Sequence, residues 1–144
     1  MGVRNFEVTF DTRDSRSLAA FWMEALGYVP MPAPKGYDTW EDWERAMEVP
    51  EEEMDQGASI MHPDGGRYIT FLNVPEPKVA KNRMHLDLDV SPDRTAPVAE
   101  RKAIVDAETE RLVALGAKVL WVGEQGEHYH ATLADPEGNE FCIR

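Results

Sequence analysis

The segment 83–90 holds the side chains best suited to proton transfer. His85, Asp87 and Asp89 alternate there with apolar residues, and successive residues of a strand point to opposite faces, so the three polar side chains would share one face. Neighbouring carboxylates favour the charged form of an imidazole. We therefore predict His85 as a catalytic residue, and Asp87 as a ligand-site residue that orients His85 or Arg83. A histidine that only forms a structural hydrogen bond is the alternative.

Glu7 is the carboxylate that we predict to act with His85. Polar and apolar residues alternate over 5–11, which is the period of a half-buried strand. This strand opens the first half of the chain as segment 83–90 opens the second. A histidine and a carboxylate that face one cavity are sufficient for proton transfer next to a carbonyl group, a step shared by many isomerases and lyases.

Two later strands present further polar side chains. In 140–144, Cys142 and Arg144 alternate with apolar residues, and His130 does so in 129–134. We predict His130 and Arg144 as ligand-binding residues, with Arg144 offering a cation to an acidic substrate. An exposed loop histidine and a frayed terminus are the alternatives for these two residues.

The elements that position these residues occur twice in the same order. Each half contains a strand, a helix and three further strands, and each helix ends in Ala-Leu-Gly, at 25–27 and 114–116. The glycine can take the left-handed conformation past the helix end, and Asp14 or Ser15 can cap the first helix. The repeat predicts an α+β fold in which helices cover the apolar sheet faces and the polar faces line one concave surface. The expected strands are 5–11, 28–29, 58–61, 68–74, 83–90, 118–122, 129–134 and 140–144, with the second helix at about 98–115.

An insertion at 30–57 has no counterpart in the second half. Residues 39–42 match a capping box and predict a short helix that carries two tryptophans on one side. Inserted segments with aromatic faces often cover a cavity, although the tryptophans can equally cap a sheet edge. The residues that we predict to line the ligand site from this half are Trp40, Trp43, Tyr68 and Thr70.

Bulk composition limits the class of partner. A length of 144 residues suits one domain, 1–144, with module one at about 1–76 and module two at about 82–144. A net charge of -12 argues against nucleic-acid binding. One cysteine excludes an intrachain disulfide and fits a reducing compartment. No apolar run approaches the roughly 20 residues that span a bilayer, so we expect a cytoplasmic protein without membrane contact.

Several motifs together resemble a known family. FDTRDSRSLAAFWMEALGY in the first half, and KNRMHLDLDV, ERLVALGAKV and DPEGNEFCIR in the second, are similar to the glyoxalase-like group of the vicinal oxygen chelate superfamily. That superfamily includes glyoxalase I, extradiol dioxygenases, and fosfomycin-resistance and bleomycin-binding proteins. The resemblance covers nearly the whole chain. It implies two paired βαβββ modules whose curved mixed sheets form a cup, with the helices packed outside.

The resemblance also implies where a divalent metal is held in the metal-dependent members. One residue from the first and one from the fourth strand of each module correspond here to Glu7, Thr70, His85 and Cys142. Because a threonine hydroxyl is a poor ligand, the expected set is Glu7, His85 and Cys142, which suits zinc better than magnesium or iron. We treat the metal as optional, and expect the Cys142 thiol to be buried and inert.

Two functions from different classes fit these features. The first is a lyase or isomerase that uses Glu7 and His85, with or without a metal, on a small oxygenated molecule. The alternative is a non-catalytic protein that binds and sequesters a small molecule, such as an antibiotic, for which the incomplete ligand set is sufficient. A regulatory subunit stays open as a third. We expect a homodimer, with the cup built within one chain or by exchange of modules between two chains.

Overall fold

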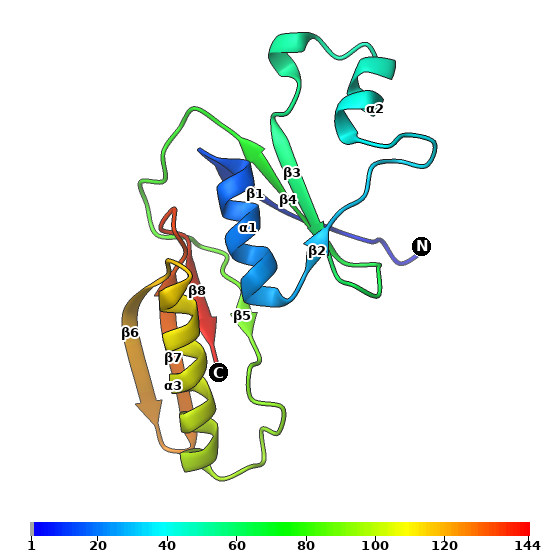
Figure 1. Ribbon diagram of the computed structural model, residues 1–144. Coiled ribbons are helices and arrows are strands. Elements are labelled where there is room, and N and C mark those ends of the chain that lie inside the picture. Colours follow the sequence, from blue (N-terminus) through cyan, green and yellow to red (C-terminus); the bar gives the residue numbers. More distant parts are fainter. Residues whose placement is uncertain (1) are drawn as a thin grey trace. The chain divides into compact units, whose positions relative to one another are not determined.

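The computed structural model describes residues 2–144, which form two compact units, unit 1 up to Pro77 and unit 2 from Lys78 to Arg144. Unit 1 contains β1 (Val8–Thr12), α1 (Ser15–Leu26), β2 (Val29–Pro30), α2 (Trp40–Ala46), the 3-10 helix η1 (Glu51–Glu53), β3 (Gly57–Met61) and β4 (Tyr68–Asn73) (Figure 1). Unit 2 contains β5 (Asp87–Leu88), α3 (Val98–Ala114), β6 (Lys118–Gln125), β7 (His128–Ala134) and β8 (Glu140–Ile143). The predicted α+β fold with a twice-repeated βαβββ order is confirmed.

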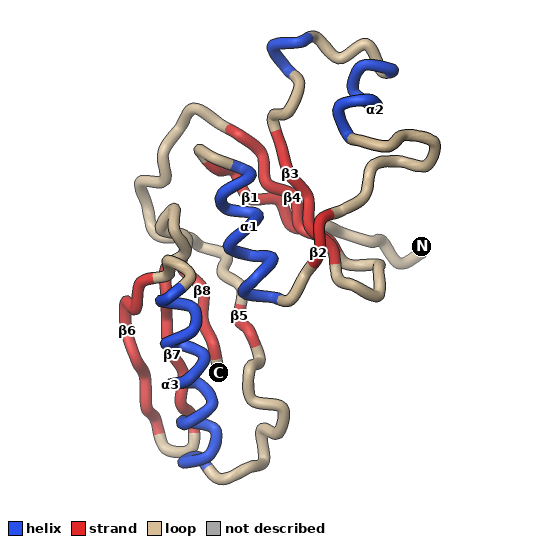
Figure 2. Tube along the Cα trace, viewed as in Figure 1, coloured by secondary structure: helices blue, strands red, loops and turns tan. Residues whose placement is uncertain are grey.

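The sheet of unit 1 has the strand order β1-β4-β3-β2, in which β1 runs parallel to β4 and the other pairs are antiparallel. Helix α1 packs on β3 and β4 and covers one face of this sheet (Figure 2). Trp22 is fully buried between that helix and the sheet, with its ring 5.7 Å from the ring of Phe10. The apolar face of β1 therefore meets the helix, and its polar face lies on the opposite side of the sheet.

Local signals fix the ends of α1. The Asp14 carboxylate accepts a hydrogen bond from the backbone N–H of Ser17, which satisfies one of the unpaired donors of the first turn. At the other end Gly27 has a φ of 67°, the left-handed conformation that ends many helices. Both predictions for this helix are confirmed. The cap at Thr39 is confirmed too, because its hydroxyl accepts a hydrogen bond from the backbone N–H of Asp42 at the start of α2.

The sheet of unit 2 has the order β5-β8-β7-β6, again with one parallel pair, β5 with β8. Helix α3 contacts β7 and β6 and buries Val105 and Leu112 against that sheet. Gly116 follows this helix with a φ of 116°. The buried residues Leu133, Phe141 and Ile143 complete this core.

The opening strand of each unit is shorter than predicted. Pairing begins at Val8 in β1 and covers only Asp87 and Leu88 in β5, so Glu7 and His85 lie just before the ladders. Phe6 and Met84, expected on apolar faces, are 91% and 83% exposed. The chain before β5 is held by a side chain instead, because Glu140 accepts a hydrogen bond from the backbone N–H of Asn82. Among residues 2–144, no helix has the length and apolar character needed to cross a bilayer.

Candidate functional site

A cluster of three potential ligand side chains lies on the polar face of unit 2. The Nδ1 atom of His85 is 2.6 Å from Oδ1 of Asp87. The Sγ atom of Cys142 belongs to the same group, because one ligand atom from each of the three residues lies within 4.8 Å of the others. We call His85, Asp87 and Cys142 the donor cluster.

Strand register explains why these residues meet. Asp87 of β5 is the direct cross-strand partner of Cys142 of β8, and Cys142 is the partner of Thr132 of β7. Side chains of directly opposed residues lie on the same face and within contact distance. His85 precedes Asp87 by two residues and therefore points to that same face.

Cys142 is half-buried, so the expectation of a buried thiol was wrong, whereas its expected inertness stays a prediction. Its Sγ atom lies 3.3 Å from Oγ1 of Thr132, a hydrogen bond in which either atom can be the donor. The thiol is near the polar face because the apolar neighbours Phe141 and Ile143 occupy the helix side of the same strand. A thiol in this position is reachable by an ion or a small molecule.

Arg144 extends the cluster with a positive charge. Its Nε donates to Oδ1 of Asp89 at 2.9 Å, and its Nη1 lies 3.4 Å from Oδ2 of Asp87. The hydrogen bond to Asp89 raises the pKa of the Arg144 guanidinium, helped by the charges of Asp89, Asp87 and Cys142. In return, the hydrogen bond from Arg144 holds the pKa of Asp89 below its usual value. The terminal arginine therefore joins β8 to the carboxylates that follow His85.

His130 lies on the same sheet face and forms an aromatic pair that the sequence analysis missed. Its ring is 5.0 Å from the ring of Trp121 on β6, with a steep interplanar angle of 68°. Both rings lie over Gly123, where an added Cβ would come within 2.4 Å of the His130 ring. No local sequence signal indicates this pair, because it depends on the register of β6 with β7, which a bulge between Val119 and Trp121 shifts by one residue.

In unit 1, Glu7 contacts Tyr68 on the polar face of the sheet. The Tyr68 hydroxyl donates a hydrogen bond to the Glu7 carboxylate, and this bond together with the carboxylate charge raises the pKa of Tyr68. Thr70, two residues further along β4, is hydrogen-bonded to Ser59 of β3 through hydroxyl groups 3.0 Å apart. Both predicted residues of β4 therefore share a face with Glu7.

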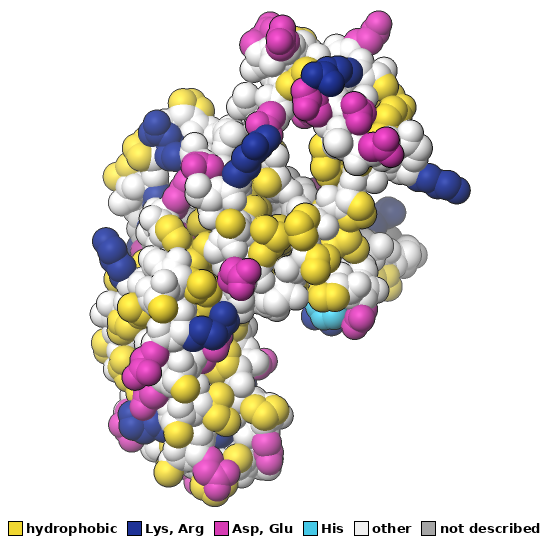
Figure 3. Space-filling model, viewed as in Figure 1, with side chains coloured by type: hydrophobic (Ala, Val, Ile, Leu, Met, Phe, Trp, Pro, Cys, Tyr) yellow, Lys and Arg dark blue, Asp and Glu magenta, His cyan; other side chains and the backbone are white. Residues whose placement is uncertain are grey.

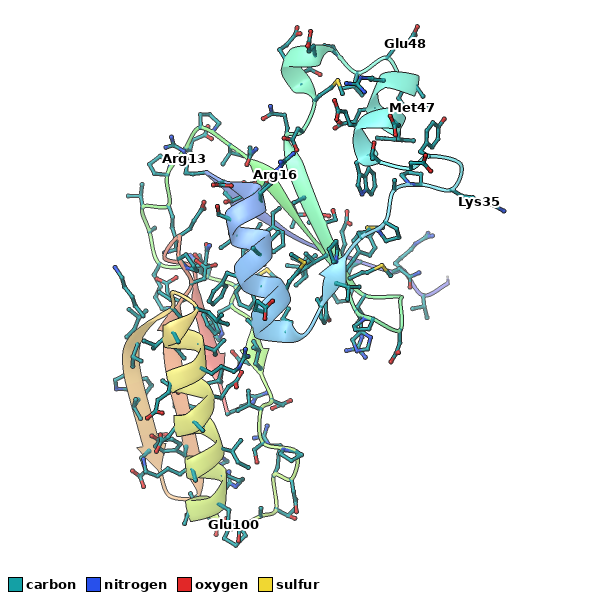
Figure 4. All side chains as sticks on the ribbon, viewed as in Figure 1. Arg13, Arg16, Lys35, Met47, Glu48 and Glu100 are labelled. Carbon is teal, nitrogen blue, oxygen red and sulfur yellow. The ribbon has the colours of Figure 1, made fainter. Side chains whose placement is uncertain are left out.

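The insertion forms one wall of a recess of about 630 Å³ in unit 1, which Trp40, Trp43 and Thr70 line together. The two indole rings lie 5.7 Å apart in an edge-to-face arrangement. Arg16, at the start of α1, reaches the insertion and forms a salt bridge with Asp55 at 2.7 Å (Figure 4). The recess is not purely apolar, because the insertion also lines it with the carboxylates of Glu41, Glu44, Glu53 and Asp55, and acidic side chains are visible on this part of the surface (Figure 3).

The structure brings the predicted residues together in two groups. His85, Asp87, Cys142, Arg144 and His130 share the polar face of unit 2. The residues of unit 1 share the opposite face from α1, namely Glu7, Tyr68, Thr70, Trp40 and Trp43. The pairing of Glu7 with His85 across the two units stays a prediction.

The donor cluster fits a divalent ion that accepts mixed ligands. Thiolate, imidazole and carboxylate are all zinc ligands, and three protein ligands leave a fourth position for water or substrate. Ligand atoms around one tetrahedral zinc lie roughly 3.3–3.8 Å apart, given its usual bond lengths. Donor atoms within 4.8 Å of one another can reach that spacing by small side-chain rotations. Asp87 is the member that the sequence analysis did not include in the metal set.

Comparison with known proteins places this geometry in a family. The family model described as a glyoxalase-like domain matches residues 7–144. The chain is similar to a glyoxalase/bleomycin resistance protein/dioxygenase family enzyme from Burkholderia phytofirmans, with 20% identity, a TM-score of 0.62, and coverage of 95% of this chain and 94% of that one. No curated protein gave a significant match.

Fosfomycin resistance proteins are also among the similar structures. A mutant of FosX from Listeria monocytogenes, in complex with Mn(II) and 1S,2S-dihydroxypropylphosphonic acid, has 14% identity and a TM-score of 0.63, with coverage of 100% of this chain and 90% of that one. FosX from Mesorhizobium loti has 12% identity and a TM-score of 0.64, with coverage of 100% and 92%. At these identities the likeness establishes the fold.

Proposed function

Because the chain belongs to the glyoxalase-like domain family of the vicinal oxygen chelate superfamily, we propose that it is an enzyme of the lyase or isomerase type that acts on a small oxygenated molecule. The observation that carries this proposal is the donor cluster, in which imidazole, carboxylate and thiol converge within 4.8 Å on one sheet face. Such a grouping of titratable side chains at a reachable position is typical of reactive centres.

We propose zinc as the ion held by His85, Asp87 and Cys142, since the soft thiolate ligand selects against magnesium. A bound zinc would polarise a carbonyl oxygen of the substrate as a Lewis acid. Mn(II) is the ion in the similar FosX structure, whereas the donor set of this chain contains a thiol. We therefore propose that this chain binds a different ion from that FosX protein.

The protein side chains supply proton transfer and orientation. Without an ion, the hydrogen bond between Asp87 and Nδ1 of His85 leaves Nε2 as the ring atom that can exchange a proton. Ion binding by both residues would replace this hydrogen bond. Glu7 is the proposed proton acceptor from the other unit, and the hydroxyl of Tyr68 keeps its carboxylate in place. If no ion is bound, His85 is the proposed base and Glu7 its partner. Both versions require the two sheets to share one cup.

The recess beside the insertion is proposed to hold the apolar part of the substrate. Its wall contains the indole rings of Trp40 and Trp43, and its sheet side ends in the hydroxyl of Thr70. Large aromatic side chains supply contact area at low entropic cost, and a few polar groups orient the ligand. The substrate is therefore expected to combine an apolar or aromatic part with oxygen functions.

A second function, sequestration of a small molecule without conversion, is favoured by that same recess. It has a volume of about 630 Å³, within the usual range for a small-molecule site. Binding there needs no reactive group. Turnover separates the two functions: a ligand that binds wild-type protein and is recovered unchanged supports sequestration, whereas conversion that is lost in His85→Ala supports catalysis.

We also propose that the protein is a homodimer and that it is located in the cytoplasm. Gel filtration of the purified protein tests the first proposal, and fractionation of source cells tests the second.

The metal proposal is tested by elemental analysis of protein purified without chelator. We expect about one zinc per chain in the wild type and its loss in Cys142→Ala. The matched control is Thr70→Ala, because Thr70 has the same strand position and a similar hydrogen bond in unit 1. The control should keep its zinc. Equal zinc content in wild type and Cys142→Ala would remove the thiol from the site.

A further inference from the structure

Unit 2 contains a small recess of about 240 Å³ next to the donor cluster. The recess exists because β7 is longer than β8, the strand on one side of it. β8 pairs only with Ala131–Ala134, whereas His128 and His130 pair only with β6. The loop between β5 and α3 and the first turn of α3 close the space where β8 has ended.

The recess collects positive charge in a chain whose net charge is -12. Three arginines, Arg94, Arg101 and Arg144, line it together with two histidines. Among its described lining residues, Asp87 is the single carboxylate. A concentration of cations in an acidic protein focuses a local positive potential and attracts small anions.

Hydrogen bonds hold two of these guanidinium groups in place. Arg144 and Arg94 both donate to the same oxygen of Asp89, at 2.9 and 3.2 Å. Arg144 also pairs with Asp87 at 3.4 Å, so two carboxylates position these two arginines at the edge of the recess. A guanidinium group has five N–H donors, so each arginine keeps further donors for a bound oxyanion.

Arg101 is anchored by neutral groups. Its Nε donates to the carbonyl oxygen of Ala96 at 3.0 Å, and its Nη2 donates to the carbonyl oxygen of Glu127. These contacts with neutral carbonyl oxygens fix the planar group between α3 and the start of β7, and the Arg101 charge also helps to lower the pKa of Asp93. A preorganised, half-buried guanidinium is well suited to bind a carboxylate or phosphate group through two parallel hydrogen bonds.

We propose that this recess binds the oxyanion group, a phosphate-type or carboxylate group, of the molecule on which the donor cluster acts. The inference rests on the proposed function, since Asp87 and Cys142 belong to both the recess and the donor cluster. An anion held by Arg94 and Arg101 would place the adjoining carbon atoms beside Cys142 and His85. The substrate class is then a small organic acid or phosphate ester.

The test is titration of metal-free protein with inorganic phosphate and, separately, with acetate, followed by calorimetry and by NMR of the arginine side chains. We expect saturable binding of at least one probe, weakened about tenfold in Arg101→Gln and in Arg94→Gln. Arg101→Lys should retain part of the affinity. Arg111→Gln is the matched control, because Arg111 lies on the same helix and pairs with Glu108. Tighter phosphate binding assigns a phosphate-type group, and tighter acetate binding assigns a carboxylate.

Binding of neither probe, or equal weakening by Arg111→Gln, would overturn the proposal. Zinc content of the same variants separates this result from failure of the proposed function. The recess variants Arg94→Gln and Arg101→Gln should keep their zinc, and Cys142→Ala should lose zinc but still bind the anion. Loss of folding in Arg101→Gln is recognised by circular dichroism, and exposed Arg94 then carries the test.

Discussion

The two modules use the same three sheet positions for different atoms. In unit 1 these positions hold the carboxylate of Glu7 and the hydroxyls of Thr9 and its cross-strand partner Thr70. In unit 2 they hold the imidazole of His85, the carboxylate of Asp87 and the thiol of its cross-strand partner Cys142. Pairing of Thr9 with Thr70 in unit 1 matches pairing of Asp87 with Cys142 in unit 2. The third strand repeats the match, because Ser59 contacts Thr70 as Thr132 contacts Cys142. The backbone frame is therefore common, and the chemistry differs.

The difference shows that the fold positions a site without determining what the site does. Hydroxyl groups in unit 1 satisfy each other and form a neutral surface next to the aromatic recess. In unit 2 the same contact includes a thiol, and a cross-strand carboxylate and a histidine face it.

A second comparison concerns two His-x-Asp pairs with identical spacing. His62 and Asp64 lie in the turn after β3, where Nδ1 of His62 accepts a hydrogen bond from the backbone N–H of Asp64. The Asp64 carboxylate is 3.8 Å from that nitrogen. At β5 the extended backbone instead places Asp87 Oδ1 at 2.6 Å from His85. Spacing in the sequence is thus not sufficient, because turn and strand direct the same side chains differently.

The largest effect is expected when unit 1 receives the side chains of unit 2. We predict that the triple variant Glu7→His, Thr9→Asp, Thr70→Cys binds a second zinc, so that zinc content rises from about one to about two per chain. Its affinity should be about 10- to 100-fold weaker than that of the natural site, because unit 1 lacks the supporting partners of unit 2. Elemental analysis and a competitive chelator titration measure both quantities.

Failure of a folded triple variant to take up a second ion would break the comparison. It would mean that surroundings beyond the three positions, such as Arg144, make unit 2 competent. The control is the variant Glu7→His, Thr9→Asp, Thr70→Ser. It keeps a hydroxyl at position 70 and should not bind the second zinc.

The sequence was sufficient to predict the frame of both units. Alternation in the strands and the glycines at 27 and 116 located the elements and the polar faces, because those signals are local. The contact between Asp87 and Cys142 depends on parallel register, and the pairing of Trp121 with His130 depends on a bulge. The first contact joins segments that are far apart in the chain, and the second depends on an irregularity inside a hairpin, so local spacing could predict neither.

An intermediate effect is expected at the two aspartates of the His-x-Asp pairs. We predict that Asp87→Asn weakens zinc binding about tenfold or more, because it removes a charged ligand. The matched variant Asp64→Asn should leave zinc affinity unchanged, since that carboxylate is exposed and lies in the turn. Chelator competition at constant pH compares the two. An equal loss of zinc affinity in both variants would show that Asp87 is not a zinc ligand.

The smallest effect concerns the residue that anchors the chain in front of β5. Glu140 is the strand counterpart of Tyr68, and its carboxylate accepts hydrogen bonds from Lys78 Nζ at 3.1 Å and from the Asn82 backbone N–H at 2.9 Å. Burial is the largest single effect and raises the pKa of Glu140, but these two hydrogen bonds, a further backbone hydrogen bond and the Lys78 charge together lower it. A lowered carboxylate pKa stabilises the folded state above the unfolded pKa, and that contribution is lost as the pH falls through the folded value.

We therefore predict that Glu140→Gln lowers the free energy of unfolding by about 1 kcal/mol at pH 7. The difference from wild type should shrink as the pH falls below about 4.5, the ordinary value for this carboxyl. Urea unfolding of both proteins at a series of pH values measures it. Tyr68→Phe is the control in unit 1, because it removes a hydrogen bond at the same strand position without changing an acid of low pKa. A Glu140→Gln difference that stays constant down to pH 3 would show that the ion pair with Lys78 contributes nothing to stability.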